Sequence, residues 1–142
     1  MEFKKAYKFR IYPDAKRQSE IDCRLVLAQQ FYNKILEKSI KAYANGQKSV
    51  SMAMFNRSVK EIIAENADYL KLCSQTGCEI GYRLKKAYSN FFLRCKKGKG
   101  KKGFPRFKSR DKYNSITCPQ DNGSFSIENN RLRVSRIGTM NT

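Results

Sequence analysis

The feature that most constrains the fold is a long run of apolar residues at helical spacing between residues 15 and 43. These residues recur at steps of three and four, which places them on one face of an α-helix; they are Ile21, Leu25, Ala28, Tyr32, Ile35, Leu36, Ile40 and Tyr43. Asp14 is a suitable N-cap, and Asn45-Gly46 ends the run. The run covers about eight turns, so it predicts either one long helix or two helices joined by a bend near residues 25–30.

Two further stretches have the same helical period. The first begins after Ser51, and its apolar side consists of Met52, Phe55, Val59, Ile62 and Ile63. The second follows Thr76 and Glu79, which have the spacing of a capping box. Its apolar side consists of Ile80, Leu84, Ala87, Tyr88, Phe91 and Cys95. Together the three stretches predict a block of three to four helices over residues 14–95.

Residues 2–12 alternate with a period of two instead. Tyr7, Phe9 and Ile11 fall on one face of this pattern, whereas Lys8 and Arg10 fall on the other. The proline at position 13 has no N–H group and cannot continue a strand ladder. The pattern therefore predicts a half-buried strand that ends before the helical block.

Period-two alternation returns after residue 114. Its first part is a short predicted strand that contains Ile116 and Cys118. The second part is a predicted hairpin in which Phe125 and Ile127 face Leu132 and Val134. Asn129-Asn130 lies between the two strands, and asparagine tolerates the positive φ of a two-residue turn. With β-structure on both sides of a helical block, the predicted fold class is α+β.

The charge of the chain indicates its class of partner. Thirty Lys and Arg residues against twelve Asp and Glu residues give a formal net charge of +18. Solubility alone needs a net charge of about 2–8 in magnitude, so this excess favours nucleic acid as the partner. No apolar run approaches the length of about 18 residues that a membrane span needs, and no membrane partner is expected. Unpaired cysteines suit a reducing compartment, so we expect a cytoplasmic protein.

The basic residues are densest in residues 96–112. This segment holds nine Lys or Arg residues against one acidic residue, Asp111, and it contains three glycines. A segment of this composition buries too little apolar surface to offset its ordering entropy, so we expect a mobile arm until a polyanion neutralises it. Phe104, Phe107 and Tyr113 interrupt the charges. Their rings either stack on bases or pack the arm against the helices.

Catalytic residues are scarce. The chain has no histidine, and its five cysteines include no C-x-x-C pair, so we expect no metal site and no cofactor. The glycines at 98, 100 and 103 follow a helix and not a strand, which suits a flexible linker better than a phosphate-binding loop. The carboxylates are scattered over helix faces beside Lys and Arg residues. The sequence therefore predicts a binding protein that is not an enzyme.

The candidate nucleic-acid-binding residues come from the first predicted strand, the third helix and the arm. Lysines on an edge strand also deter sheet-to-sheet association, which is a second explanation for the first group. The candidates are Lys4, Lys5, Lys8, Arg10, Lys85, Lys86, Arg94, Lys96, Lys97, Lys99, Lys101, Lys102, Phe104, Arg106, Phe107, Lys108, Arg110 and Lys112.

Five ordered motifs resemble those of one family. They are AYKFRIYP near the start, QFYNKILE at 30–37, KKAYSNFF at 85–92, KKGFPRFKS at 101–109 and the closing RLRVSRIG. In order and spacing the chain resembles the N-terminal half of the TnpB/OrfB proteins of insertion sequences, and the resemblance covers essentially the whole chain. GFPRFKS after a helix that ends in AYSNFF is its most specific part.

The resemblance implies a fold and a function. TnpB/OrfB proteins are RNA-guided DNA endonucleases whose N-terminal half is a β-barrel wedge domain interrupted by a helical recognition domain, once described as a helix-turn-helix. By this resemblance, residues 1–13 are the first wedge-type strand, 14–95 the recognition-type helices, 96–113 the basic arm and 114–142 the wedge-type hairpin region. The helices are then inserted between strands of a partial barrel. The family's RuvC nuclease domain and zinc ribbon come later, so we expect a truncated protein that does not cleave.

Three hypotheses follow for the function. In the first, the chain binds guide RNA, target-adjacent DNA, or both. In the second, it is a stand-alone regulator that titrates guide RNA or transposon-end DNA, as a homodimer formed through an open β edge. In the third, which only the charge favours, it is a structural protein associated with the ribosome or with other RNA.

Overall fold

The computed structural model describes residues 2–46, 52–71, 74–98, 103–118, 125–134 and 137–142. These contain three α-helices: α1 (Ala15–Ala44), α2 (Met52–Glu65) and α3 (Ser74–Lys97). Two short 3-10 helices, Ala67–Lys71 and Arg110–Lys112, follow α2 and precede the sheet. The strands are β1 (Phe125–Glu128), β2 (Arg131–Val134) and β3 (Gly138–Asn141). The fold class is α+β, as the sequence predicts.

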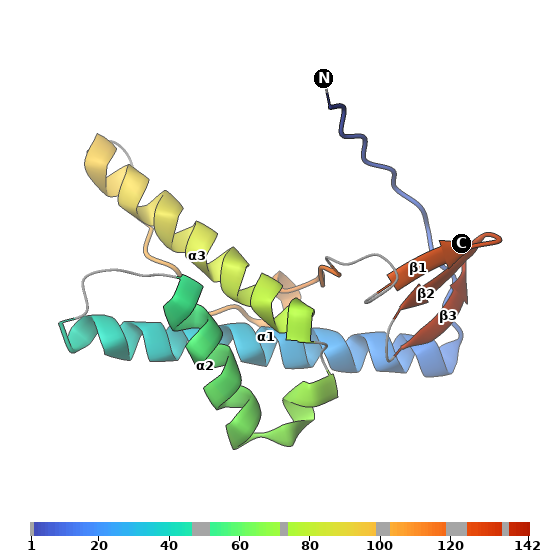
Figure 1. The fold of residues 1–142 in the computed structure, drawn as a ribbon, viewed down its shortest axis with the longest axis horizontal. Helices are drawn as coiled ribbons and strands as arrows, with labels where there is room; N and C mark the ends of the chain where they lie inside the picture. The colour runs from blue at the N-terminus through green and yellow to red at the C-terminus, as the bar shows by residue number, and fades with distance from the viewer. Residues whose placement is uncertain (1, 47–51, 72–73, 99–102, 119–124, 135–136) are drawn as a thin grey trace.

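Helix α1 runs along the longest dimension of the molecule, and the other helices and the sheet lie beside it (Figure 1). It is one continuous helix of 30 residues, so the alternative of two helices joined by a bend is wrong. The Asp14 carboxylate accepts a hydrogen bond of 2.8 Å from the backbone N–H of Arg17, which confirms the predicted N-cap. At the other end Asn45 is the C-cap and Gly46 has a φ of +93°, so the predicted stop is also confirmed.

The core lies where α2 and α3 cross α1. All three helices contribute apolar side chains to it, and the fully buried ones include Phe31, Ile35, Leu36, Phe55, Ile62, Leu84 and Tyr88. Each of these helices carries the apolar stripe that its sequence period indicates. Gly81 allows α2 and α3 to approach closely, because a Cβ atom at this position would lie 3.4 Å from the Cβ of Phe55.

Helix α3 begins earlier than the sequence predicts. Its first residue is Ser74, so Thr76 lies inside the first turn and is not the N-cap of a capping box. Packing explains the extension. Gly77 is buried where a Cβ would lie 3.5 Å from Val59 and 3.6 Å from Phe31, so this turn adds contact between the helices. Tertiary packing decides the helix start here, and the local capping signal does not.

The core also contains a tyrosine cluster. Tyr88 and Ser39 share a buried hydrogen bond of 2.7 Å between their hydroxyls. The ring centroids of Tyr32 and Tyr113 are 5.8 Å apart. Burial, followed by the neighbouring Tyr113 and Tyr88, raises the pKa of Tyr32 from 10.0 to about 12. Burial also raises the pKa of Tyr88 and of Tyr113.

These tyrosines predict a loss of stability in alkali. A phenol whose pKa is raised in the folded state stabilises the fold fully below its unfolded pKa of about 10. That contribution is lost as the pH rises through the folded pKa of about 12. We expect the free energy of unfolding to fall by about 3 kcal/mol over this window through Tyr32 alone. Denaturant titrations at a series of pH values measure the fall.

Two variants test the assignment to Tyr32. Tyr32→Phe should reduce the fall in the free energy of unfolding, whereas the control Tyr43→Phe, at an exposed position, should leave it unchanged. Equal falls in both variants would contradict the assignment.

The sheet is an antiparallel meander in the order β1-β2-β3. Phe125 pairs with Val134 and Ile127 pairs with Leu132, which confirms the predicted hairpin. Its turn residues Asn129 and Asn130 have φ values of +49° and +59°. Strand β3 was not predicted, because its sequence Gly-Thr-Met-Asn contains only one residue with a strong strand preference.

The predicted strand over residues 2–12 is wrong. Residues 2–10 are exposed, and the segment makes a single isolated bridge, from the Tyr12 N–H to the Asn141 carbonyl at 2.9 Å. The bridge is antiparallel, so residues before Tyr12 run away from β3, and no described backbone pairs with them. Alternation specifies which residues would share a face, but a strand also needs a neighbour. In the described residues, the chain before α1 therefore joins the sheet only through this bridge. The helices are not inserted between two paired strands of a partial barrel.

The predicted strand at Ile116 and Cys118 is also wrong. Residues 113–118 contain no strand and are bound by α3 instead. Arg83 donates a hydrogen bond of 2.9 Å to the Ser115 carbonyl and one of 2.8 Å to the Thr117 hydroxyl. Ile116 packs against the helical core. The alternation is real, but its apolar side faces helices and its backbone is held by an arginine side chain.

Candidate nucleic-acid interface

The basic arm is docked on the helices where the structure describes it. Asn33 of α1 binds both backbone groups of Lys108: its amide nitrogen donates to the carbonyl at 2.9 Å, and its amide oxygen accepts from the N–H at 2.8 Å. Gln29 donates to the same carbonyl at 2.7 Å. The expected mobile arm is therefore wrong for residues 103–113. Side-chain amides of α1 satisfy the backbone, and the buried Pro105 and Tyr113 anchor the segment.

The two phenylalanines of the arm differ in their surroundings. The ring of Phe104 meets those of Tyr88 and Phe91 edge to face, at centroid distances of 5.5 and 5.2 Å. Phe104 therefore mainly packs the arm against α3. Phe107 is 57% exposed and has no described ring contact. Of the two rings, Phe107 is the one open to a nucleic-acid base.

The cations of the arm also divide into two groups. Arg106, Lys108 and Lys112 are exposed. Arg110 instead donates a hydrogen bond of 3.2 Å to the Tyr113 carbonyl, and its guanidinium is 3.9 Å from the carboxylate of Asp22. The docked backbone fixes where the exposed cations begin, so phosphate binding by these cations would cost less conformational entropy than binding by a mobile arm. Three other candidates, Lys99, Lys101 and Lys102, lie outside the described residues.

The candidates on α3 extend from its middle to its C-terminal end. Lys85 is half-buried and Lys86 is exposed. Arg94 donates a hydrogen bond of 2.8 Å to the carbonyl of Gly103, so it holds the start of the arm. Two more cations, Lys96 and Lys97, are exposed in the last turn, where the helix dipole favours positive charge.

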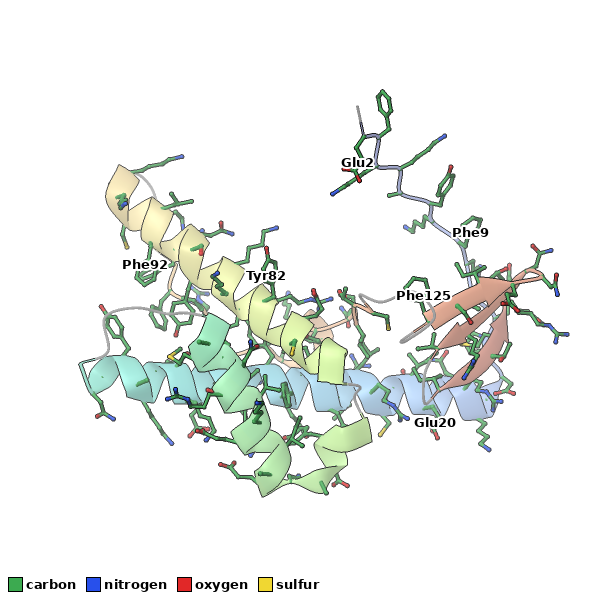
Figure 2. The ribbon with its side chains drawn as sticks, viewed as in Figure 1. Glu2, Phe9, Glu20, Tyr82, Phe92 and Phe125 are labelled. Carbon is green, nitrogen blue, oxygen red and sulfur yellow. The ribbon has the colours of Figure 1, made fainter. Side chains whose placement is uncertain are left out.

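The N-terminal segment exposes cations and rings together. Tyr7 and Phe9 are each 69% exposed, and their rings stack at 6.3 Å. The Lys5 ammonium lies 5.5 Å from the Tyr7 ring centroid, and the Arg10 guanidinium lies over the Tyr12 ring at 5.6 Å. Two further candidates, Lys4 and Lys8, are exposed on the same segment. Figure 2 shows Phe9 on this segment, away from the helices.

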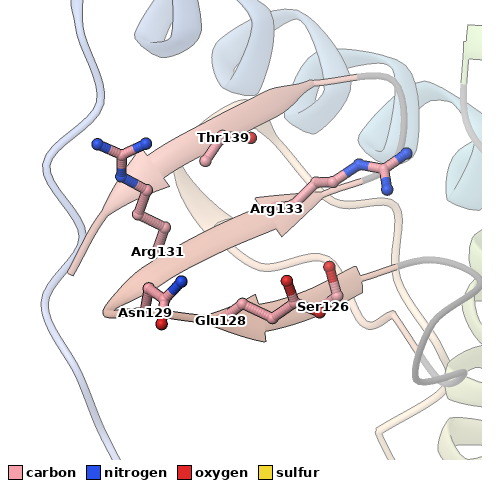
Figure 3. A pocket seen from close by; sticks show the side chains of 6 residues that line it. All are labelled: Ser126, Glu128, Asn129, Arg131, Arg133 and Thr139. Atoms are coloured by element: carbon pink, nitrogen blue, oxygen red, sulfur yellow. The ribbon is translucent and has the colours of Figure 1, made fainter.

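The sequence interpretation missed the arginines of the sheet. Arg131 and Arg133 of β2 line a hollow of about 530 Å³ together with Ser126, Glu128, Asn129 and Thr139 (Figure 3). Alternation in Arg131-Leu132-Arg133-Val134 was the available signal, because it places both arginines on one face of the predicted hairpin. The structure thus places exposed cations on the arm, on the N-terminal segment and on the sheet.

In the described part of the chain, no three His, Cys, Asp or Glu side chains come close enough to hold a metal ion. None of the described helices combines the length and the apolar character that a membrane span needs.

Comparisons with known proteins support the resemblance. Residues 1–48 match the model of a helix-turn-helix domain family named for OrfB of IS605. A Streptomyces pristinaespiralis protein with the provisional name RNA-guided DNA endonuclease is 27% identical over 135 residues. The match covers 94% of this chain and 32% of that protein, so the chain spans about a third of the length of the curated relative. Both findings confirm the similarity to TnpB/OrfB proteins.

The matched region has a simple structure. Within residues 1–48, the described part contains the N-terminal segment and the single helix α1. The helices that pack against α1 are α2 and α3, which follow the matched region. Any surface made by two helices of this chain therefore extends beyond the matched residues.

Proposed function

We propose that this chain binds nucleic acid as the N-terminal part of a TnpB-like protein, holding guide RNA, target-adjacent DNA, or both, through backbone phosphates. The match of residues 1–48 to a helix-turn-helix domain supports nucleic-acid binding. The name of the Streptomyces relative supports an RNA-guided context. The net charge of +18 supports recognition of a polyanion.

The docked arm carries this proposal. Asn33 and Gln29 fix the backbone at Lys108, and the exposed Arg106, Phe107 and Lys108 follow one another at this point. Cations beside an open aromatic ring combine phosphate neutralisation with base stacking. We call the hydrogen bonds of Asn33 and Gln29 to the Lys108 backbone the backbone clamp. An arm that merely increased solubility would need neither this clamp nor an exposed ring.

Sequencing of the nucleic acid that copurifies with the chain tests the proposal. The expected result is enrichment of RNA or DNA from the ends of a transposon, relative to a variant in which Arg106 and Lys108 are both glutamine. Enrichment of ribosomal RNA in the unchanged protein would contradict the proposal and favour a ribosome-associated structural protein. Recovery of no nucleic acid above the variant would contradict both.

We propose further that these residues bind without cleaving. The described part of the chain offers no convergent set of metal ligands for two-metal hydrolysis. Labelled RNA and DNA incubated with the chain and Mg²⁺ or Mn²⁺ should therefore remain intact. Cleavage that survives independent repurification and is abolished by EDTA would contradict this part of the proposal.

A stand-alone dimeric regulator remains the second candidate, and the sheet edge favours it. No described strand pairs with the outer edge of β1, where Ile127 is 60% exposed. Open edges recruit strands, and covering apolar surface stabilises by about 25 cal/mol per Å².

Self-association through this edge is the expected result for the second candidate. Light scattering over a range of concentrations should show a dimer that Ile127→Lys abolishes. Ile127 is the position chosen because it lies on β1, at the outer edge of the sheet. A monomer at all concentrations would contradict the dimer.

A further inference from the structure

The polar face of the sheet forms two rows of cross-strand neighbours. In one row Arg133 of β2 lies between Ser126 of β1 and Thr139 of β3. In the other, Arg131 lies between Glu128 and Asn141. Within the described residues, neither guanidinium donates a hydrogen bond or forms an ion pair.

The opposite face explains why these arginines point outward. Leu132 and Met140 pair across β2 and β3 on that face, and Met140 is only 4% exposed. The sheet is beside the N-terminal part of α1, where a Cβ on Gly138 would lie against the Arg17 guanidinium, 3.1 Å from its Cζ. One face is thus fixed against the body of the protein. The strand alternation then directs Arg131 and Arg133 to the other face.

The two rows differ in charge. Arg131 pairs across the strands with Glu128, an acidic residue that partly compensates its charge. Arg133 has a neutral hydroxyl on each side, from Ser126 and Thr139. One guanidinium and two hydroxyl groups on the same face of the sheet supply several donors, which suits an oxyanion such as phosphate. The hollow above them, of about 530 Å³, has room for a phosphate and its attached groups.

We propose that Arg133, Ser126 and Thr139 bind a phosphate of a nucleic-acid strand, a site that adds to the arm and the N-terminal segment. Arg131 is two residues away along β2, about 6.6 Å, and reaches a neighbouring phosphate of the same strand. Contacts of this kind position a backbone without reading its sequence. The site rests on the proposed function, because it assigns part of the same nucleic-acid contact.

The path of the strand continues from the sheet to the N-terminal segment. The row of Arg131 ends at Asn141, and Asn141 is the residue that bridges to Tyr12. The Arg10 guanidinium lies over the ring of Tyr12. A backbone bound at Arg133 and Arg131 thus meets the next cation at Arg10, across Asn141 and Tyr12.

The test compares two arginines that carry the same charge. Arg133→Gln removes the proposed phosphate ligand, and Arg57→Gln removes an exposed arginine from α2, which lies away from the sheet (Figure 1). The probe is a labelled single-stranded RNA of about 20 nucleotides, longer than the roughly 4–16 nucleotides that one OB fold covers. Fluorescence anisotropy gives the dissociation constant at several salt concentrations.

Arg133→Gln should weaken binding about tenfold, as expected for one charge-assisted hydrogen-bonded contact. It should also reduce the magnitude of the salt slope by about 0.7. The double variant Ser126→Ala and Thr139→Val, which keeps all charges, should weaken binding with little change in slope. If the unchanged protein binds, two results together would overturn this site. They are equal affinities for Arg133→Gln and Arg57→Gln, and an unaltered affinity for the double variant. Absence of binding by the unchanged protein would overturn the proposed function itself.

Discussion

Substituting glutamine for both Arg106 and Lys108 should weaken RNA and DNA binding by on the order of a hundredfold, about tenfold for each lost contact, and flatten its salt dependence. Both side chains are exposed on the docked arm, and each lost phosphate contact removes about 0.7–0.9 from the magnitude of the slope of log K against log salt. A reduction of about 1.4–1.8 is therefore expected. The backbone clamp on Lys108 uses main-chain atoms, so the substitution leaves it in place.

Arg57 and Lys60 supply the matched control. They are one arginine and one lysine, both exposed on α2, so their replacement by glutamine makes the same change in net charge. This control variant should retain the slope of the unchanged protein to within about 0.5, because long-range attraction is screened beyond a Debye length of about 10 Å. Equal losses in the two variants would show that the total charge matters and that the arm has no special role.

Phe55→Ala should destabilise the fold by about 3–5 kcal/mol, the largest effect expected of a single substitution here. Phe55 is fully buried, lies against Gly81 of α3 and packs with the Tyr88 ring at 6.4 Å. A typical domain has a free energy of unfolding of about 5–15 kcal/mol, so the variant retains little stability. Denaturant unfolding followed by circular dichroism measures the change.

Phe107→Ala is the matched aromatic control for stability. Its ring is 57% exposed, so the free energy of unfolding should change by less than about 0.5 kcal/mol. The same substitution should weaken binding to single-stranded RNA by about 1–3 kcal/mol if the ring stacks on a base. A large loss of stability for Phe107→Ala, or none for Phe55→Ala, would contradict the division between packing and binding residues.

The helices could be predicted because their signals are local. The apolar period of residues 15–43, the Asp14 cap and the Asn45-Gly46 stop all concern neighbours in sequence, and α1 has these features. The Asn129-Asn130 hairpin is equally local, since two adjacent residues with positive φ define it. Such features depend little on what the rest of the chain does.

The errors concern partners that are distant in sequence. The alternation of residues 2–12 does not reveal whether a neighbouring strand exists, and the structure supplies only the bridge to Asn141. The charge of the arm indicated mobility, but Asn33 of α1, which is 75 residues away in the sequence, forms hydrogen bonds with its backbone. Helix α3 starts at Ser74 because Gly77 packs on other helices. These contacts appear only once the chain is folded.

The candidate site was predicted by charge and only partly by geometry. Arg106, Lys108 and Phe107 are exposed as nucleic-acid ligands need to be, whereas Arg94 and Arg110 bind carbonyl groups of the protein itself. A sequence does not distinguish an arginine that closes a loop from one that faces solvent. Hydrogen bonds to the protein do make that distinction.

The central claim is that this chain binds nucleic acid through several phosphate contacts. The most direct measurement is the affinity of the nucleic-acid-free protein for RNA and DNA of unrelated sequences as a function of salt. A linear decrease of log K with log salt is expected for each of them, with a slope magnitude of about 3.5–5.4 for five or six phosphate contacts. Undetectable binding at low salt, or an affinity that does not change with salt, would contradict it.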